Sequence, residues 1–245
     1  MNKIYVVGIG PGDLKQMTIR CHEVIKECDV VVGYNKYVEL IGALILDKDV
    51  YKSGMRTEVE RCKTAVEKTL SGNKVALVSS GDSGVYGMAG LVYEIIRTEG
   101  LQDKIEIEVV PGISASQSAA SLLGAPLMHD FVTISLSDWL TDISLIEKRL
   151  HVAGEGDFVV VIYNPKSKAR PDIIDEASDI LLEYKSDKTP VGIVRDAYRQ
   201  NQSIEITTLG EMTESEINMT TTIIIGNHMT FTDFDKIITP RGYKL

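Results

Sequence analysis

The sequence predicts an α/β protein made of two α/β domains. Short apolar runs alternate with helix-length amphipathic segments along the whole chain, which is the pattern of α/β architecture. Most of the runs are continuously hydrophobic, as strands are when both faces of their sheet are covered, typically in parallel sheets. The runs are also too numerous for one small sheet.

Eight runs are candidate strands: residues 3–9, 29–33, 74–79, 105–110, 131–135, 157–163, 190–194 and 220–226. The stretch VVPGISA, residues 109–115, joins a run to a Pro-Gly break and then to a segment of small residues. We therefore place the domain boundary near residue 112. The prediction is an N-terminal domain over 1–112 and a C-terminal domain over 113–245.

Four segments between the runs carry helix signals. Residues 57–70 begin with a Thr and a Glu at capping-box spacing, and residues 114–124 end on a C-terminal glycine. Residues 142–154 start on an acidic N-cap residue. Residues 170–185 have a proline in the first turn.

The composition excludes several classes of protein. The chain has 245 residues, 44% of them hydrophobic, and a net charge of −9, which disfavours a broad basic face for nucleic acid. The three cysteines lack C-x-x-C spacing, so we expect reduced thiols and no disulfide framework or zinc site. No signal peptide or membrane-length apolar run is evident. We expect a soluble cytoplasmic protein with no nucleic-acid or membrane partner.

Three glycine-containing loops follow candidate strands: GIGPGD (8–13), SSGDSGVYG (79–87) and VVPGISA (109–115). Ligands of open α/β sheets bind beyond the carboxyl ends of the strands, and glycine lets a ligand reach the backbone. Each loop alone is more often a simple turn. Together they predict a pocket for a ligand that carries little negative charge.

The first loop resembles a dinucleotide fingerprint, but it does not complete one. Gly8 and Gly10 fit G-x-G-x-x-G, whereas Asp13 takes the position of the third glycine. A carboxylate there would repel a diphosphate, and Pro11 removes one N–H donor. No P-loop motif is present either. A dinucleotide-dependent oxidoreductase is therefore the weaker alternative.

The three loops, in this order and spacing, resemble those of the tetrapyrrole (corrin and porphyrin) methyltransferases. Longer stretches are similar to one branch of that family, which methylates carbon 17 of a precorrin-3-type ring and contracts the ring in cobalamin biosynthesis. These stretches are GYNKYVELI, SGMRTEVERC, GAPLMHDFVTISLSDWLT, YNPKSKAR and TPRGY. The resemblance extends from about residue 3 to residue 243.

The resemblance implies two α/β domains, a homodimer, and S-adenosylmethionine in the cleft between the domains, with S-adenosylhomocysteine as the product. Carried over position by position, the cofactor pocket would use Pro11, Ser80, Gly81, Asp82, Val85, Ser114, Ala115, Tyr163 and Ala197. Two departures stand out. Ser83 takes the place of a common proline, which we expect to loosen its turn. Asp142-Ile143 replaces a Pro-Trp pair, which leaves a substrate role there unsupported.

Methyl transfer requires alignment of the reactants and exclusion of water more than a protein nucleophile or metal. The four histidines are scattered, and we expect no protein-bound metal. Ring contraction also moves protons, so general acid–base help is plausible. The candidates are His129, Asp130, Ser135, Ser137 and Asp138, with the two serines on one strand face. The alternative is that the aspartates cap turns and His129 only packs, so no catalytic residue is assigned.

The basic loop YNPKSKAR carries Lys166, Lys168 and Arg170. A tetrapyrrole has a fringe of carboxylates, which lysine and arginine bind well. We therefore expect this loop to bind substrate, although a solvated surface is the common role of such a run. Arg56 is a further candidate, and Arg195 and Arg199 are secondary ones.

Three other functions remain open from the sequence: methylation at another ring carbon, the oxidoreductase above, and a non-catalytic S-adenosylmethionine sensor. The sequence also leaves open whether the substrate already contains cobalt.

Overall fold

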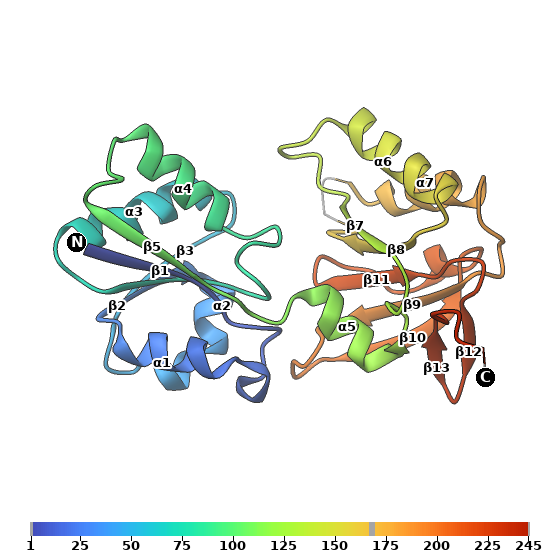
Figure 1. The fold of residues 1–245 in the computed structure, drawn as a ribbon, viewed down its shortest axis with the longest axis horizontal. Coiled ribbons are helices and arrows are strands. Elements are labelled where there is room, and N and C mark those ends of the chain that lie inside the picture. The colour runs from blue at the N-terminus through green and yellow to red at the C-terminus, as the bar shows by residue number, and fades with distance from the viewer. Residues whose placement is uncertain (1, 167–169, 245) are drawn as a thin grey trace. The chain divides into compact units, whose positions relative to one another are not determined.

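The structure is a computed structural model that describes residues 2–166 and 170–244 (Figure 1). The chain divides into two compact units, Met1–Ala115 and Ser116–Leu245. Each unit has its own sheet and its own hydrophobic core. The α/β fold class predicted from the sequence is confirmed.

The first unit is a five-stranded parallel sheet with strand order β3-β2-β4-β1-β5. Its strands are β1 (Asn2–Gly8), β2 (Val30–Tyr34), β3 (Asp49–Ser53), β4 (Val75–Ser79) and β5 (Ile105–Val110). Its α-helices are α1 (Ile19–Glu27), α2 (Asn35–Leu40), α3 (Glu58–Leu70) and α4 (Ala89–Thr98), and two short 3-10 helices are η1 (Leu14–Gln16) and η2 (Gly42–Leu44).

Both faces of this sheet are covered by helices (Figure 1). Ile4 and Val6 of β1 pack in a cluster with α3 and α4. Tyr5 and Val7, which point to the opposite face, pack in a second cluster with α1 and α2. Because each face needs its own apolar residues, the strand reads as a continuous hydrophobic run.

The three cysteines are free and buried in these clusters. Cys21 and Cys28 lie in the cluster with α1, and Cys62 lies in the cluster with α3. Burial raises the pKa of each thiol to about 12. All three are therefore protonated at neutral pH.

The second unit contains a five-stranded sheet with strand order β10-β9-β11-β8-β7 and a small three-stranded sheet, β12-β13-β6. Its strands are β6 (Gly124–Ala125), β7 (Phe131–Ser135), β8 (Val159–Tyr163), β9 (Pro190–Arg195), β10 (Ser203–Thr208), β11 (Thr221–Ile225), β12 (Phe231–Asp233) and β13 (Lys236–Ile238). Its helices are α5 (Ala115–Leu123), α6 (Ile143–Glu155), α7 (Ile173–Leu182) and the 3-10 helix η3 (Met212–Glu214).

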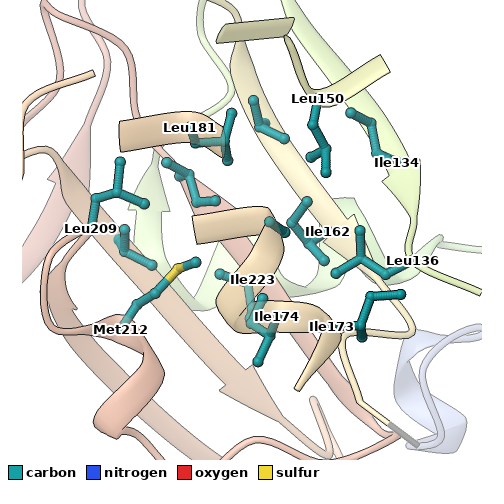
Figure 2. Close-up of a cluster of buried hydrophobic side chains, with 14 of the residues drawn as sticks. Ile134, Leu136, Leu150, Ile162, Ile173, Ile174, Leu181, Leu209, Met212 and Ile223 are labelled. Carbon is teal, nitrogen blue, oxygen red and sulfur yellow. The ribbon is translucent and has the colours of Figure 1, made fainter. Parts of the chain in front are cut away.

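The larger sheet of the second unit is mostly antiparallel, whereas its apolar runs were typical of parallel strands. Only β7 and β8 pair in parallel, and the other neighbours in this sheet run antiparallel. The runs are continuous because both faces are covered, by α6 and α7 on one side and by α5 on the other. Figure 2 shows the cluster on the α6 and α7 side, to which Ile134, Ile162 and Leu181 belong. Covering of both faces, and not strand direction, determines this pattern.

Two of the four predicted helix signals are confirmed and two are wrong. Asp142 caps α6, because its side chain accepts a hydrogen bond from Ser144 N, and Gly124 follows α5 at φ +118. The capping box predicted at Thr57 is wrong. The Thr57 hydroxyl instead donates to Gly54 O and bonds Ser53 Oγ, so it holds the preceding turn. The proline predicted in the first turn of the last helix is also misplaced, because α7 begins only at Ile173 and Pro171 lies before its N-cap, Asp172.

Candidate functional site

The three glycine-containing loops lie side by side in the first unit. Strand β1 pairs with β4 on one side and with β5 on the other, all in parallel, so the loops that follow the three strands leave the same edge of the sheet. The first two loops are directly bonded. Gly10 N donates to Gly81 O at 3.0 Å, and Gly81 N donates to Gly10 O at 2.7 Å.

Two further glycines allow the loop backbones to touch. A Cβ atom at Gly8 would lie 2.7 Å from both Gly112 N and Gly81 O, and one at Gly112 would clash with the carbonyl oxygens of Gly81 and Gly8. Side chains are therefore excluded here by neighbouring backbone. Gly81 differs, because a Cβ there would make ordinary contacts of 3.6 Å with Ser114 and Ala115, but its φ of +67 disfavours other residues.

The carboxylate of Asp82 joins the second loop to the third. It accepts hydrogen bonds from Gly84 N at 2.8 Å and from Gly112 N at 3.0 Å. Ser83, expected to loosen this turn, instead anchors it: its buried hydroxyl donates to Val6 O at 3.1 Å. The second loop is thus fixed to both β1 and the third loop.

The first loop does not have the geometry of a dinucleotide site. Its Asp13 side chain accepts from Lys15 N and caps the three-residue helix η1. The α-helix that follows begins only at Ile19, behind its own Thr18 cap. A pyrophosphate site needs an α-helix that opens directly from the glycine loop, so this loop argues against the oxidoreductase alternative.

Unusual backbone conformations accompany several predicted site residues. Tyr86, which follows Val85, has a φ of +52, and Asn164, which follows Tyr163, also has a φ of +52. Asp196 and Tyr198, on either side of Ala197, have φ values of +47 and +56, and Arg56 itself has a φ of +63. Residues other than glycine are uncommon in this region, and such outliers concentrate at functional sites.

The predicted cofactor residues of the second unit pack together. Tyr163 at the end of β8 and Ala197 after β9 both contact the apolar cluster beneath α5. The Tyr163 hydroxyl accepts a hydrogen bond from Ser116 N at 2.8 Å, at the start of that helix. Tyr163 thereby connects the carboxyl end of β8 to the first turn of α5.

The acid–base candidates are separated by strand β7. His129 and Asp130 precede the strand, and the His129 ring nitrogen Nδ1 accepts from Asp130 N. Ser135 ends the strand, beside Tyr163 on β8. At about 3.3 Å per residue, the five residues of β7 place Phe131 and Ser135 roughly 13 Å apart, and His129 precedes Phe131. His129 and Ser135 therefore belong to opposite ends of the sheet.

Ser137 and Asp138 lie beyond the end of β7, so the strand-face argument for Ser137 is wrong. Ser137 N donates to Ser135 Oγ, which also accepts from Asn164 Nδ2 at 2.9 Å. Asp138 forms an ion pair with Arg170 at 2.9 Å, and Arg170 Nη1 donates to Leu136 O. This end of the sheet brings Ser135, Asp138 and Arg170 together.

The other basic candidates have varied surroundings. Lys166 is half-buried after β8, while Lys168 lies outside the described residues. Arg195 is engaged within its own unit, because its Nε donates to Ser203 Oγ and its Nη1 pairs with Glu216. Arg199 is 3.9 Å from Asp196. The backbone N of Arg56 donates to Glu58 Oε1.

Two polar residues, one of them the first residue of the second loop, are absent from the site residues that the sequence predicted. Arg61 on α3 and Ser79 at the end of β4 are buried and line one cavity of the first unit. Arg61 falls in the buried stripe of α3 with Ala65 and Thr69. A charged residue in a core-facing stripe was the available signal.

Within residues 2–166 and 170–244, no three His, Cys, Asp or Glu side chains form a metal-binding group. In the same part of the chain, every helix is too short or too polar to cross a bilayer.

Comparisons with known proteins identify the family. The Tetrapyrrole (Corrin/Porphyrin) Methylases family matches residues 3–213. The chain is 48% identical to the probable cobalt-factor III C(17)-methyltransferase of Salmonella typhimurium over 98% of this chain and 99% of that protein. It is 51% identical to the cobalt-factor III methyltransferase of Priestia megaterium, over 99% of this chain but only 45% of that longer protein.

The fold is similar to that of a solved relative. The crystal structure of the methyltransferase CobJ matches with a TM-score of 0.93 and 34% identity, covering 98% of this chain and 100% of that one. The family match covers most of the chain, and the relatives agree with it in sequence and fold. The chain belongs to the tetrapyrrole (corrin/porphyrin) methylases.

Proposed function

We propose that this protein is an S-adenosylmethionine-dependent methyltransferase that methylates carbon 17 of a precorrin-3-type tetrapyrrole, with ring contraction, in cobalamin biosynthesis. Family membership and the names of the relatives from Salmonella and Priestia support the reaction. Both names refer to cobalt-factor III, so the preferred substrate already carries cobalt. That cobalt belongs to the substrate.

One observation in the structure carries the proposal: the loops after β1, β4 and β5 form a single bonded unit at the carboxyl edge of a parallel sheet. This edge is where ligands of open α/β sheets bind. The glycine contacts and the Asp82 bridge fix the loops before any ligand arrives. In a preorganised site, binding does not have to order the loops, so less of the favourable binding free energy is lost to conformational entropy.

The chemistry of these loops fits S-adenosylmethionine. Residues 8–13, 79–87 and 110–115 contain no Lys or Arg, so they offer no counter-charge to a phosphate. Their two carboxylates, of Asp13 and Asp82, are each bonded to backbone N–H groups. When bound, S-adenosylmethionine supplies a methyl group on a positively charged sulfur. The residues that would hold it are Pro11, Ser80, Gly81, Asp82, Val85, Ser114 and Ala115, with Tyr163 and Ala197 from the second domain.

The carboxylates of the macrocycle would be bound by Lys166, Lys168, Arg170 and Arg56. Arg170 is already paired with Asp138, so a substrate carboxylate would share its guanidinium. Proton transfer during ring contraction would use Ser135 or Asp138, which lie at the same sheet end as Tyr163. His129 and Asp130 are the less favoured candidates, because they lie at the other end of β7.

The remaining proposals concern organisation. We expect domains over 1–112 and 113–245, with the cofactor cleft between them, and a homodimer in the cytoplasm. The partners would be the anionic tetrapyrrole and S-adenosylmethionine, without nucleic acid, membrane or a protein-bound metal.

The decisive experiment is an anaerobic incubation of the pure protein with methyl-labelled S-adenosylmethionine and a precorrin-3-type substrate, either cobalt-loaded or metal-free. Mass spectrometry and NMR should find the label on carbon 17 of a contracted ring, and faster turnover with cobalt. Label at another ring carbon would instead support a tetrapyrrole methyltransferase of different regiospecificity. Binding without transfer would support a sensor, and calorimetric binding of NAD but not S-adenosylhomocysteine would overturn the assignment.

A further inference from the structure

A cavity of about 160 Å³ lies in the first unit at the carboxyl ends of β2 and β4. Aromatic rings, one acidic side chain and one basic side chain share its wall. The second glycine loop contributes Ser80, Tyr86 and Gly87 to that wall. A group bound in the cavity would therefore touch the loop that is proposed to bind S-adenosylmethionine.

Arg61 is the basic residue of this cavity, and only 4% of its surface is exposed. Its Nε donates to Ser53 Oγ at 3.1 Å, Nη2 donates to Gly54 O at 2.5 Å, and Nη1 contacts Met88 Sδ at 3.5 Å. All three partners are neutral. Among the residues described by the structure, no carboxylate lies within 4 Å of its guanidinium.

A buried guanidinium without an anion is energetically unusual. Burying a charge is costly unless it is paired, and arginine is almost never buried alone. The acidic residue of the cavity wall, Glu58, does not pair with Arg61 but accepts from Arg56 N at 3.2 Å. The cavity thus holds a cation whose natural partner, an oxyanion, is missing from the described protein.

Ser79 provides an independent sign of a ligand. Its hydroxyl is buried, with 3% of the residue exposed, and has no hydrogen-bond partner among the described residues. It lines the same cavity as Arg61. Buried hydroxyls nearly always find partners, so a ligand oxygen in the cavity would satisfy both groups. The Tyr34 ring, 5.8 Å from the guanidinium, helps to fix its plane.

We propose that Arg61 and Ser79 bind a carboxylate of the tetrapyrrole substrate in this cavity. The inference rests on the proposed function, which supplies a polycarboxylate ligand. The carboxylate of S-adenosylmethionine has the same chemistry, so the test must separate the two sources. A macrocycle held through this cavity would be anchored beside the second glycine loop, where its methyl donor is proposed to bind.

The test compares two titrations on the intact chain, one with uroporphyrin III as a polycarboxylate tetrapyrrole and one with S-adenosylhomocysteine. Arg61→Gln should weaken uroporphyrin binding by roughly tenfold to a hundredfold, the size of one charge-assisted contact. S-Adenosylhomocysteine affinity should be unchanged. Arg61→Lys should recover part of the loss. Arg97→Gln, an equal charge change at an exposed site of α4, is the matched control.

A second variant guards against simple misfolding. Glu58→Gln keeps the acceptor for Arg56 N but removes the negative charge from the cavity wall, so it should strengthen uroporphyrin binding severalfold. A purely structural role for Arg61 would not produce opposite effects in these two variants.

Unchanged uroporphyrin affinity in folded Arg61→Gln would overturn the inference while leaving the proposed function intact. Loss of S-adenosylhomocysteine alone would assign the cavity to the cofactor carboxylate and would also overturn it. If the wild type bound neither ligand, the proposed function and this inference would fail together.

Discussion

Gly10 and Gly81 exchange a pair of backbone hydrogen bonds, at 3.0 and 2.7 Å, although 71 positions separate them in the chain. The pair forms an isolated antiparallel bridge between loops that leave neighbouring parallel strands. Both residues have positive φ values, +72 and +67, which glycine adopts without strain. The bridge is the point at which the first two loops become one surface.

Replacing Gly81 by valine should weaken S-adenosylhomocysteine binding. A β-branched residue at φ +67 is strained by about 1–2 kcal/mol or more, and its side chain would enter the space against Ser114 and Ala115. Gly72→Val is the control, because Gly72 has φ +92 and open space around it, and it precedes β4, whereas the second loop follows that strand. Both variants should lose stability in urea unfolding. Equal loss of affinity in both would remove Gly81 from the pocket.

Replacing Asp82 by asparagine should loosen the link between the second and third loops. Asparagine offers one acceptor oxygen, so its amide group would face either Gly84 N–H or Gly112 N–H. We expect about 1–3 kcal/mol of lost stability and a smaller effect on S-adenosylhomocysteine affinity than Gly81→Val has. Calorimetry and urea unfolding measure the two quantities. A larger affinity loss than for Gly81→Val would make the carboxylate a direct ligand.

The ion pair of Asp157 and Lys185 should make stability depend on pH. Burial alone would raise the pKa of Asp157, but hydrogen bonds from His228 and Lys185 outweigh it and lower the pKa below its ordinary value. A carboxyl with a lowered folded pKa stabilises the protein above its unfolded pKa, near 4, and that contribution disappears as the pH falls through the folded value.

Asp157→Asn should therefore lose about 1–3 kcal/mol at pH 7, and the difference from wild type should shrink below about pH 4. Urea unfolding at pH 7 and at pH 3 gives both values. Asp179→Asn, at an exposed site of α7, should change neither. A difference that stays constant with pH would contradict this account.

Lys166 and Arg170 should respond differently to alanine. Lys166→Ala should weaken uroporphyrin binding by roughly tenfold and leave the free energy of unfolding unchanged. Arg170→Ala should also lower stability, by about 1–2 kcal/mol, since it breaks the bonds to Asp138 and Leu136 O. Lys148→Ala on exposed α6 is the control. If Lys166→Ala bound the tetrapyrrole as tightly as the wild type, the Lys166 side chain would have no role in substrate binding.

The strands that the sequence predicts best are those with buried faces. β1, β4, β8 and β11 are apolar runs because helices cover both faces of their sheets. The edge strands β3 and β10 were not predicted, because neither contains a buried residue and polar residues interrupt both, which leaves no apolar run. The antiparallel pairing in the second sheet could not be predicted from the sequence. A strand that is covered on both faces has the same apolar pattern whether it runs parallel or antiparallel to its neighbours.

The glycine loops were predictable because glycine is required where backbone meets backbone, as at Gly8 and Gly112. Arg61 was missed because its surroundings depend on Ser53, Gly54 and Met88, which the fold brings together. The separation of His129 from Ser135 follows from the length of β7. It needed the strand bounds, which sequence patterns leave uncertain by a few residues.

The three buried thiols can be used to measure when the first unit unfolds. Only a thiolate reacts readily with alkylating reagents, so Cys21, Cys28 and Cys62 are protected until the apolar clusters around them separate. The second unit contains no cysteine and is therefore not labelled by alkylating reagents. Pulse labelling in mild denaturant, read by mass spectrometry, would therefore time the opening of the first unit alone. Adducts at Cys21 and Cys28 ahead of Cys62 would reveal that the α1 side of the sheet is exposed first.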